Sequence, residues 1–344
     1  MAILDHWHPV WEARSLGAKP VRVTLGGESI ALFRTEEGKV GALVDCCVHR
    51  RARLSLGEVV GERLRCSYHA WSYDLEGNGE SPGTPKMHAC ASSFETAEKY
   101  GYLWIRNRQA KSSMPQFDID GYERVCTREY LIDAPLELVL DNFTEVEHTP
   151  TTHANFGYEL SKMHEVVTHV EATESTVHVV NTGPQKKTPW IVNHLGGLRT
   201  GDQFTDDWTT FFSPVYTVYD QFWNDPKTGE ERPDRWRIYV FFNPIDDRTT
   251  QLVVFAYLRA GTPGRVAYIR FTRPILAKLV DIEVQCDVRM LESLADKNPS
   301  IEGMKLSRFD KVLGLQRDRI EKIYRGSDTN GHPRAPNHPL ASNA

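Results

Sequence analysis

The fold is decided by Cys46-Cys47-Val48-His49 and, after sixteen intervening residues, Cys66-Ser67-Tyr68-His69. Each segment carries a cysteine followed closely by a histidine. Thiolates and imidazoles are both ligands of transition metals. The side chains of Cys47, His49, Cys66 and His69 therefore predict a metal centre held by two loops. Cys46 is out of register with this spacing, and we interpret it as a small packed residue.

Two kinds of centre use two cysteines and two histidines. A structural zinc site is the first, but zinc fingers place their histidines as a C-terminal pair, whereas here each cysteine precedes its own histidine. The two loops instead resemble those of Rieske domains, in which each loop supplies one Cys and one His to a [2Fe-2S] cluster. The resemblance implies that Cys47, His49, Cys66 and His69 bind such a cluster.

The loops depart from the usual Rieske pattern at three positions. Val48 stands where the family usually has Pro, and Arg51 and Ala70 stand where it usually has Gly. These changes affect the stiffness of the loops and the solvation of the cluster. They remove no ligand.

The composition is that of a globular enzyme. The chain has 344 residues, 40% hydrophobic and 25% charged, as in ordinary globular proteins. A net charge of −5 without a dense run of Lys and Arg argues against nucleic acid or an anionic membrane as partner. No apolar run approaches the roughly 18 residues that span a bilayer, and residues 1–6 do not resemble a signal peptide. The six cysteines show no short paired spacing, which is typical of reduced thiols. We therefore expect a cytoplasmic protein.

Three regions are expected along the chain. Residues 1–110 are expected to form an all-β domain, residues 111–325 a second domain, and residues 326–344 a flexible tail. The polar stretch at 110–121, which contains Pro and Ser, is expected to connect the two domains. His332 and His338 lie in that tail and are not expected to bind metal. Alternating apolar residues and glycine turns predict strands in the first domain at 21–25, 30–34, 39–44 and 102–105.

The second domain contains Glu145-Val146-Glu147-His148-Thr149-Pro150-Thr151-Thr152-His153. Five residues along a straight helix rotate a side chain by about 140°, so His148 and His153 share a face only if the helix ends between them. Pro150 disfavours helix at Thr149, which predicts that His148 lies on a last helical turn and that His153 returns from the next segment. Two histidines with a carboxylate form the facial triad of non-heme Fe(II) oxygenases. In a chain with 13 histidines the pair is weak evidence by itself, but beside the first centre it predicts an iron site.

The third iron ligand is expected on a helix that starts at Pro274. One face of this helix carries Leu276, Val280, Val284, Asp287, Leu291 and Leu294. Asp287 is the only acid in this apolar row, and a buried carboxylate needs a partner charge, a proton or a metal. Glu283 is the rival ligand, and a hydrogen bond to a neighbouring Arg or backbone group is the alternative for Asp287. We interpret Asp281 as a solvated charge.

Together the two motifs resemble the terminal oxygenase component of a Rieske non-heme iron oxygenase, in the phthalate and vanillate demethylase-like group of the aromatic-ring-hydroxylating family. The resemblance implies an α+β chain with an all-β Rieske domain followed by an α+β catalytic domain. The catalytic domain would contain a curved antiparallel sheet flanked by helices, a helix-grip or START-like fold. The strand-like runs at 236–242 and 251–257 suit that sheet. The implied ligands of the mononuclear iron are His148, His153 and Asp287.

The resemblance also implies roles for two polar residues. In the family an acid three residues before the first iron histidine, usually Asp, bridges to the second Rieske histidine of a neighbouring subunit. Here these residues are Glu145 and His69, and the longer Glu side chain departs from the pattern. Asn142 matches a family Asn near the iron, with a helix N-cap as its alternative role. Glu147 is interpreted as a solvated neighbour.

The implied activity is hydroxylation or oxidative demethylation of an aromatic or other hydrophobic small molecule with O2 as cosubstrate. Because the chain has no Gly-x-Gly-x-x-Gly fingerprint, we expect a separate NAD(P)H-dependent reductase, with or without a ferredoxin. The family's electron path between subunits implies a homotrimer. The alternatives are cis-dihydroxylation of a ring and, from another class, a Rieske electron-transfer protein without oxygenase activity.

Overall fold

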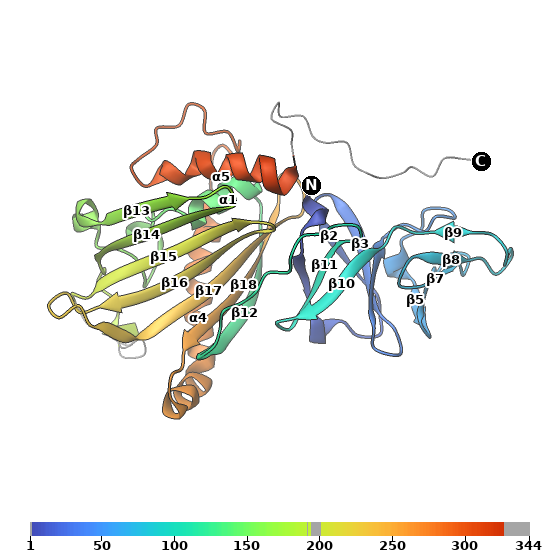
Figure 1. The fold of residues 1–344 in the computed structure, drawn as a ribbon, viewed down its shortest axis with the longest axis horizontal. Coiled ribbons are helices and arrows are strands. Elements are labelled where there is room, and N and C mark those ends of the chain that lie inside the picture. The colour runs from blue at the N-terminus through green and yellow to red at the C-terminus, as the bar shows by residue number, and fades with distance from the viewer. Residues whose placement is uncertain (1, 191, 194–200, 327–344) are drawn as a thin grey trace. The chain divides into compact units, whose positions relative to one another are not determined.

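The computed structural model describes residues 2–190, 192–193 and 201–326 (Figure 1). The chain divides into two compact units. The first comprises residues 1–115 with 245–247 and 325–344, and the second comprises 116–244 with 248–324. The expected flexible tail, with His332 and His338, lies outside the described residues apart from Gly326. Among the described residues no helix is long and apolar enough to cross a membrane.

The first unit is built from short antiparallel strands. These are β1 His8–Glu12, β2 Val21–Leu25, β3 Glu28–Arg34, β4 Val40–Val44, β5 Glu58–Val60, β6 Arg63–Arg65, β7 Ser72–Tyr73, β8 Asn78–Glu80, β9 Ala89–Cys90, β10 Phe94–Lys99 and β11 Tyr102–Asn107. They form three sheets in the orders β1-β11-β10, β2-β3-β4 and β5-β6-β7-β8-β9. Short helices lie at η1 Ile3–Asp5, η2 Ala13–Ser15 and η3 Leu54–Leu56. The strands expected from the alternating pattern are confirmed as β2, β3, β4 and β11.

Strand β3 is buried on both faces and joins two hydrophobic cores. Ile30 and Leu32 point into a core with Val10, Leu103 and Ile105. Because side chains alternate along a strand, Ala31 and Phe33 point the other way, into a second core. That core also contains Leu43, Cys47, Leu54, Leu64, Cys66, Trp71 and Tyr73. The two cysteines of the predicted cluster motif are therefore packed into the interior of the unit.

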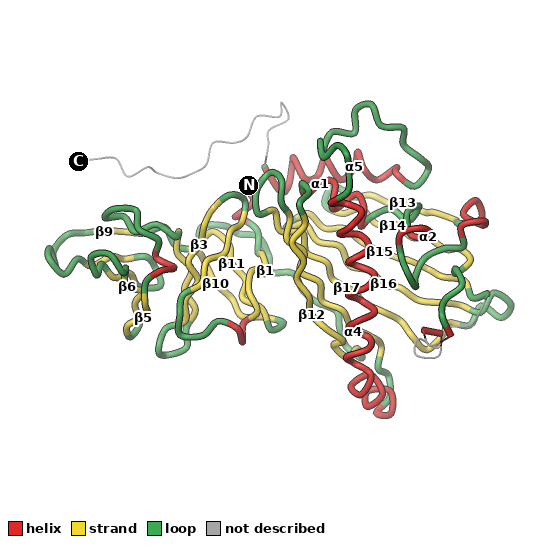
Figure 2. The backbone as a smooth tube through the Cα atoms, turned by 180° about the vertical axis from the view of Figure 1, so that it is seen from behind, coloured by secondary structure: helices red, strands yellow, loops and turns green. Residues whose placement is uncertain are grey.

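The second unit is one seven-stranded antiparallel sheet with helices. Its strands are β12 Tyr122–Ile132, β13 Val167–Ala172, β14 Thr176–Pro184, β15 Gln203–Phe212, β16 Val215–Asn224, β17 Glu231–Pro244 and β18 Thr250–Arg259, in the order β12-β18-β17-β16-β15-β14-β13. Its helices are α1 Leu136–Phe143, α2 Thr149–Thr152, α4 Pro263–Glu292 and α5 Leu313–Arg319, with short turns η4 Leu160–Glu165, η5 Asp310–Val312 and η6 Ile320–Arg325. Figure 2 shows α4 running along one face of this sheet. The predicted α+β fold, with a β unit followed by a helix-flanked antiparallel sheet, is confirmed.

The prediction that a helix starts at Pro274 was wrong. Helix α4 begins at Pro263, where Thr262 Oγ1 accepts a hydrogen bond from Arg265 N at 3.3 Å, and it passes through Pro274. A proline inside a helix removes one backbone hydrogen bond. The helix continues because Leu276 and the buried residues after it pack into the interior, so tertiary packing outweighs the local cost.

Candidate metal centres

The two cysteine loops of the first unit share one backbone pattern. In each, the cysteine N–H donates to the carbonyl five residues later, and the N–H four residues later donates back to the cysteine carbonyl, with N···O distances of 2.7–3.1 Å. Cys47 and Cys66 thus occupy equivalent positions in two similar turns. The fourth residue after each cysteine has a positive φ, 59° at Arg51 and 57° at Ala70. These are the two positions at which the resembling family usually has glycine, the residue that adopts this conformation without strain.

The side chains of the two loops suit a metal cluster. Cys47 and Cys66 are free and only 2% and 3% exposed, and burial raises the pKa of the Cys66 thiol, so a thiolate here needs a cation beside it. The rings of His49 and His69 lie 4.5 Å apart between centroids. Partial desolvation, with the charges of His49 and Arg50, lowers the pKa of His69, which favours the neutral imidazole that binds metal.

Two neighbouring aromatic side chains hold this arrangement. Trp71 stacks on His49 with centroids 4.8 Å apart. The hydroxyl of Tyr73 lies 3.1 Å from Cys47 Sγ and accepts a hydrogen bond from Val48 N at 3.3 Å. A hydroxyl hydrogen bond to a ligating sulfur is one of the means by which proteins tune a cluster. The donor set of two buried sulfurs and two adjacent imidazoles fits a Rieske [2Fe-2S] cluster.

Ala70→Gly is expected to stabilise the first unit. Removing the Cβ at a positive φ relieves local strain, and we expect a gain of about 0.5–1 kcal/mol in the free energy of unfolding. The measurement is thermal unfolding followed by the visible absorbance of the cluster. Ala89→Gly is the control, because Ala89 lies in strand β9, where glycine should destabilise. A loss of stability in Ala70→Gly would contradict the strain argument.

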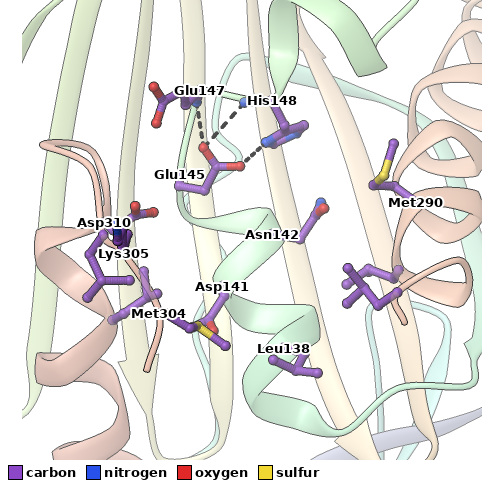
Figure 3. Close-up of a pocket in the computed structure, with 14 residues that line it drawn as sticks. Leu138, Asp141, Asn142, Glu145, Glu147, His148, Met290, Met304, Lys305 and Asp310 are labelled. Atoms are coloured by element: carbon purple, nitrogen blue, oxygen red, sulfur yellow. Dashed lines mark hydrogen bonds and ion pairs between the residues drawn. The ribbon is translucent and has the colours of Figure 1, made fainter. Parts of the chain in front are cut away.

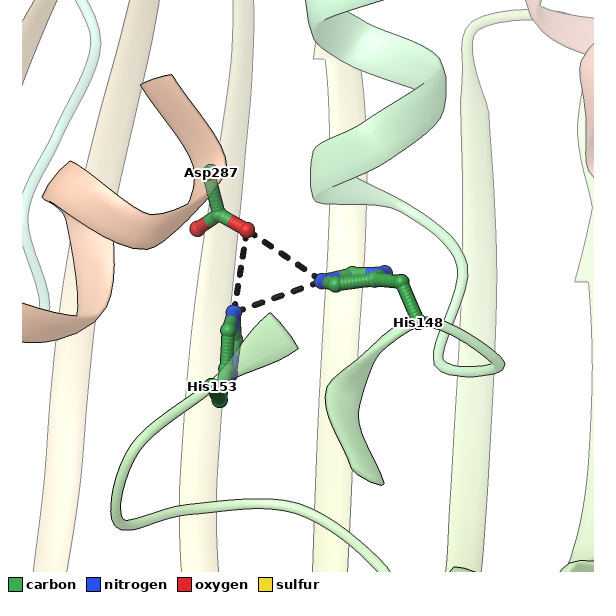
Figure 4. Close-up of side chains that lie close together, drawn as sticks. All are labelled: His148, His153 and Asp287. Carbon is green, nitrogen blue, oxygen red and sulfur yellow. Dashed lines mark hydrogen bonds and ion pairs between the residues drawn. The ribbon is translucent and has the colours of Figure 1, made fainter. Parts of the chain in front are cut away.

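The second unit brings together His148, His153 and Asp287 (Figure 4). Their facing atoms form a triangle: His148 Nε2 and His153 Nε2 are 3.3 Å apart, and they lie 3.3 Å and 3.0 Å from Asp287 Oδ1. Three ligands on one face of an octahedral ion, each bound at about 2.1 Å, lie about 3 Å from one another. The triangle therefore fits a single transition-metal ion with open positions on the opposite side.

The local geometry of the histidines differs from the prediction. Helix α1 already ends at Phe143, and His148 is the N-cap of the short helix α2, while His153 is its C-cap. Pro150 lies in the first turn of α2, where its missing N–H is not needed, instead of ending a helix that carries His148. One short turn therefore brings both imidazoles to the same side.

Polar residues behind the triangle orient its members. Glu145 Oε1 is hydrogen-bonded to His148 Nδ1 (Figure 3), and Glu283 Oε2 lies 3.7 Å from His153 Nδ1. Asn142 Nδ2 donates to Asp287 Oδ1 at 3.0 Å. A carboxylate at the outer nitrogen of a histidine fixes the tautomer and directs the lone pair of the other nitrogen to the metal.

The structure decides between several sequence-based alternatives. Asn142 lies near the C-terminal end of α1 and is not an N-cap. Glu283, the rival ligand, accepts hydrogen bonds from Asn155 N at 2.9 Å and Asn155 Nδ2 at 2.6 Å, so it lies behind His153 and outside the triangle. Asp281 is not simply solvated, because it accepts from Arg128 and Tyr130 at 2.9 Å and 2.8 Å. Glu147 is exposed, as expected.

The electrostatics of the triangle favour positive charge at its centre. Burial alone would lower the pKa of His148, but its hydrogen bonds to Asp287 and Glu145 raise that pKa to about 10. Burial would raise the pKa of Asp287, but the neighbouring charges of His153 and His148 hold it well below its usual range. A divalent metal supplies the same positive charge without protons.

Lys186 holds the histidine segment in place and was missed in the sequence. It follows β14, and its Nζ donates to three carbonyls of the α2 turn: Thr149 O at 3.3 Å, Pro150 O at 3.1 Å and His153 O at 2.6 Å. Thr149 O also accepts from His153 N, whereas the carbonyls of Pro150 and His153 lie towards the C-terminal end of a helix too short to satisfy them. The only sequence signal is a lysine after a strand, which is not distinctive.

Lys186→Met is expected to weaken metal binding at the triangle, because the α2 turn loses three hydrogen bonds from one charged group. We expect about tenfold weaker iron retention, equivalent to about 1.4 kcal/mol. Iron per chain after dialysis against a chelator measures this, and the cluster absorbance should not change. The neighbouring Lys187 is exposed, so Lys187→Met is the matched control. Equal iron retention in both variants would refute the role of Lys186.

The triangle opens on a cavity of about 110 Å³ between α4 and the sheet. Most of its lining is apolar or aromatic: Phe143, Phe156, Tyr219, Trp236, Ile238, Val240, Val254, Leu279, Val280 and Val284. Asp206 also lines it, and burial raises the pKa of Asp206 to about 7. The sequence did carry a signal for Asp206, because it occupies an inward position of the alternation Phe204, Asp206, Trp208.

A second and larger hollow, of about 620 Å³, is also lined by Asn142, Glu145 and His148 (Figure 3). Leu138, Met290, Met304 and Leu306 are among its lining residues. Glu145 lines both hollows. Asn142 and His148 line both hollows as well, so these three residues belong to the wall that the two hollows share.

Comparisons with known proteins match both parts of the chain. Residues 6–97 match the Rieske [2Fe-2S] domain, and residues 132–321 match the vanillate O-demethylase oxygenase C-terminal domain. A methylxanthine N1-demethylase of Pseudomonas putida is 34% identical over 43% of this chain and 46% of its own length. A putative toluene-4-sulfonate monooxygenase iron-sulfur subunit of Comamonas testosteroni is 27% identical over 71% of this chain and 65% of its own length. Both alignments therefore span less than two thirds of these relatives.

The fold is also found in solved structures. Dicamba monooxygenase bound to 3,6-dichlorosalicylic acid superposes with a TM-score of 0.74 at 19% identity, over 94% of this chain and 97% of that chain. At this identity the likeness concerns the fold.

Proposed function

The chain belongs to the Rieske oxygenases with a vanillate O-demethylase-type C-terminal domain, and from this we propose that it hydroxylates or oxidatively demethylates a small aromatic or other hydrophobic molecule. The observation that carries the proposal is the triangle of His148 Nε2, His153 Nε2 and Asp287 Oδ1 at the wall of an apolar cavity. A pure electron carrier needs neither feature.

We assign the site residues as follows. Cys47, His49, Cys66 and His69 would hold the Rieske cluster, and His148, His153 and Asp287 would hold a mononuclear Fe(II). For the domains we keep the boundaries 1–110, 111–325 and 326–344. When bound, the two centres supply electrons one at a time and activate O2.

The protein's own residues position the reaction. Glu145 occupies the outer nitrogen of His148, so that its Nε2 presents a lone pair. The Glu283 carboxylate lies 3.7 Å from the outer nitrogen of His153, close enough to act on it by charge without a hydrogen bond. Asn142 holds the Asp287 carboxylate in its orientation. The aromatic and aliphatic walls of the cavity exclude water and hold a ring beside the triangle.

The partners follow from the same scheme. Electrons from NAD(P)H would come from a separate reductase, directly or through a ferredoxin. In a homotrimer, His69 of one subunit would approach Glu145 of the next, and the hollow beside Glu145, lined by both apolar and charged side chains, offers a surface for that approach. The free cysteines of the described chain suit a reducing, cytoplasmic location.

A substrate screen tests the proposed function. Purified holoenzyme with a surrogate reductase is given methylated and unmethylated aromatic compounds, and the products are identified directly, because O2 reduction without substrate turnover consumes NADH as well. Hydroxylated or demethylated products support the proposal. Cis-diols would identify the dihydroxylating alternative, and a reduced cluster that never yields product would support the electron carrier.

Asp287→Ala is expected to empty the mononuclear site, because one of three protein ligands is lost and two buried imidazoles remain without a counter-charge. Iron per chain should fall by about one third, because the mononuclear ion is lost and the two irons of the cluster remain. The Rieske EPR signal should stay intact. Glu292→Gln is the matched control, since it removes a charge from an exposed position of the same helix, away from the triangle. Full iron content in Asp287→Ala would point to a different ligand.

Glu145→Ala is expected to keep both metal centres yet slow electron delivery to the mononuclear iron. The loss of its hydrogen bond to His148 should reduce turnover by roughly tenfold to a hundredfold, as for other groups that support metal ligands. Single-turnover kinetics of the pre-reduced enzyme measure the step. Glu147→Ala, at the exposed neighbouring position, should behave as wild type. Full turnover by Glu145→Ala would exclude the bridging role.

A further inference from the structure

The inner face of the sheet carries a polar pair on the cavity wall, among the apolar and aromatic side chains of its strands. In the antiparallel ladder Asp206 pairs with Gln221, and Gln221 pairs with Trp236, so the three side chains form one cross-strand row. All three line the cavity onto which the metal triangle opens. Asp206 is 7% exposed and lies between the buried Phe204 and Trp208 of its strand. A carboxylate in such a place is costly unless a partner satisfies it.

The protein satisfies this pair only in part. Gln221 Nε2 donates to Asp206 Oδ1 at 3.1 Å. The described chain offers no hydrogen-bond donor to Asp206 Oδ2 or to Gln221 Oε1, and neither oxygen is among the fully enclosed atoms without a partner. Two acceptor oxygens on neighbouring strands are therefore left for a molecule in the cavity.

The charges around the cavity also favour a ligand that donates hydrogen bonds. The described lining of the cavity includes the carboxylates of Asp206, Glu145, Glu283 and Asp287 and no Lys or Arg, and its two histidines, His148 and His153, face Asp287 in the triangle. At Asp206 and Gln221 a substrate carboxylate or sulfonate would therefore meet a like charge, with no Lys or Arg among these residues to pair with it. A cation or a strong N–H donor would instead complete the hydrogen bonding of Asp206.

We propose that Asp206 and Gln221 recognise the substrate, and that the substrate is a small, single-ring compound bearing a protonated amine or another N–H donor. The proposal rests on the proposed oxygenase function and specifies its substrate class. The size of the cavity agrees, since about 110 Å³ is on the scale of an apolar protein cavity of about 150 Å³ that accepts benzene. An anchor on β15 and β16 fixes which ring substituent lies nearest the metal triangle.

Binding of three probes of similar size tests the proposal. Benzylamine, toluene and benzoate differ mainly in the charge and hydrogen bonding of one substituent, and their affinities for the anaerobic holoenzyme are measured by calorimetry. We expect benzylamine to bind about tenfold or more tightly than benzoate. Asp206→Asn should reduce the benzylamine affinity about tenfold and leave that for toluene unchanged.

The matched control is Asp207→Asn. Asp207 follows Asp206 on β15, does not line the cavity, and pairs with His178 Nε2 at 2.8 Å. It should leave all three affinities unchanged. Circular dichroism and the cluster spectrum show whether each variant folds. If Asp206→Asn fails to fold, Gln221→Leu removes the other half of the pair. We expect this variant to reduce the benzylamine affinity as well.

The outcomes separate this inference from the proposed function. Benzoate binding as well as benzylamine, no measurable benzylamine binding, or unchanged affinities in the folded variant would each overturn the inference. If benzylamine binds as expected but no methylated aromatic amine yields product with the reductase, the recognition site stands and the proposed function fails. If aromatic carboxylates are converted to product, and Asp206→Asn converts them as fast as the wild type does, the proposed function stands and the recognition site fails.

Discussion

The second unit depends on one electrostatic constraint: two imidazoles and one carboxylate meet within about 3 Å, the ligand spacing of a single octahedral ion, in a largely buried place. The carboxylate and the pair of imidazoles come from two distant parts of the chain, so both parts must be positioned together. Helix α4 packs beside the sheet and carries Asp287. The α2 turn carries both histidines, and Lys186 ties that turn to the end of β14. The apolar cavity then forms where α4, the turn and the sheet leave space between them.

The first unit positions its four predicted metal ligands with two short loops. Its two loops repeat one turn, and both cysteines point into the core that β3 shares with its neighbours. Burial holds the sulfurs, while ring contacts among His49, His69 and Trp71 hold the imidazoles. The positive φ values at Arg51 and Ala70 are the local cost of that turn.

Much of this arrangement was predictable because it depends on local patterns. Alternating apolar residues predicted β2, β3 and β4, and an acid in an apolar helical row singled out Asp287, which the structure brings to both histidines. The predictions at the two prolines were wrong, because the rule for proline is local while its outcome depends on packing. Pro150 lies in the first turn of a helix instead of ending one, and Pro274 lies within a helix instead of starting it. Lys186 was missed because the carbonyls that it binds are far away in the sequence. The alternation of strand β15 did mark Asp206 as inward, but its role depends on Gln221 of the neighbouring strand.

The link from Lys186 to the carbonyls of the α2 turn also bears on how the unit comes apart. Lys186 adds three hydrogen bonds from the end of β14 to those that the turn makes within itself, so the order of the turn depends in part on that strand. Opening of that edge of the sheet would therefore release the histidines in the same cooperative event. Metal loss and local unfolding would then be two measures of one equilibrium. A bound ion is therefore expected to protect the backbone of β14 from hydrogen exchange, although none of its ligands lies on that strand.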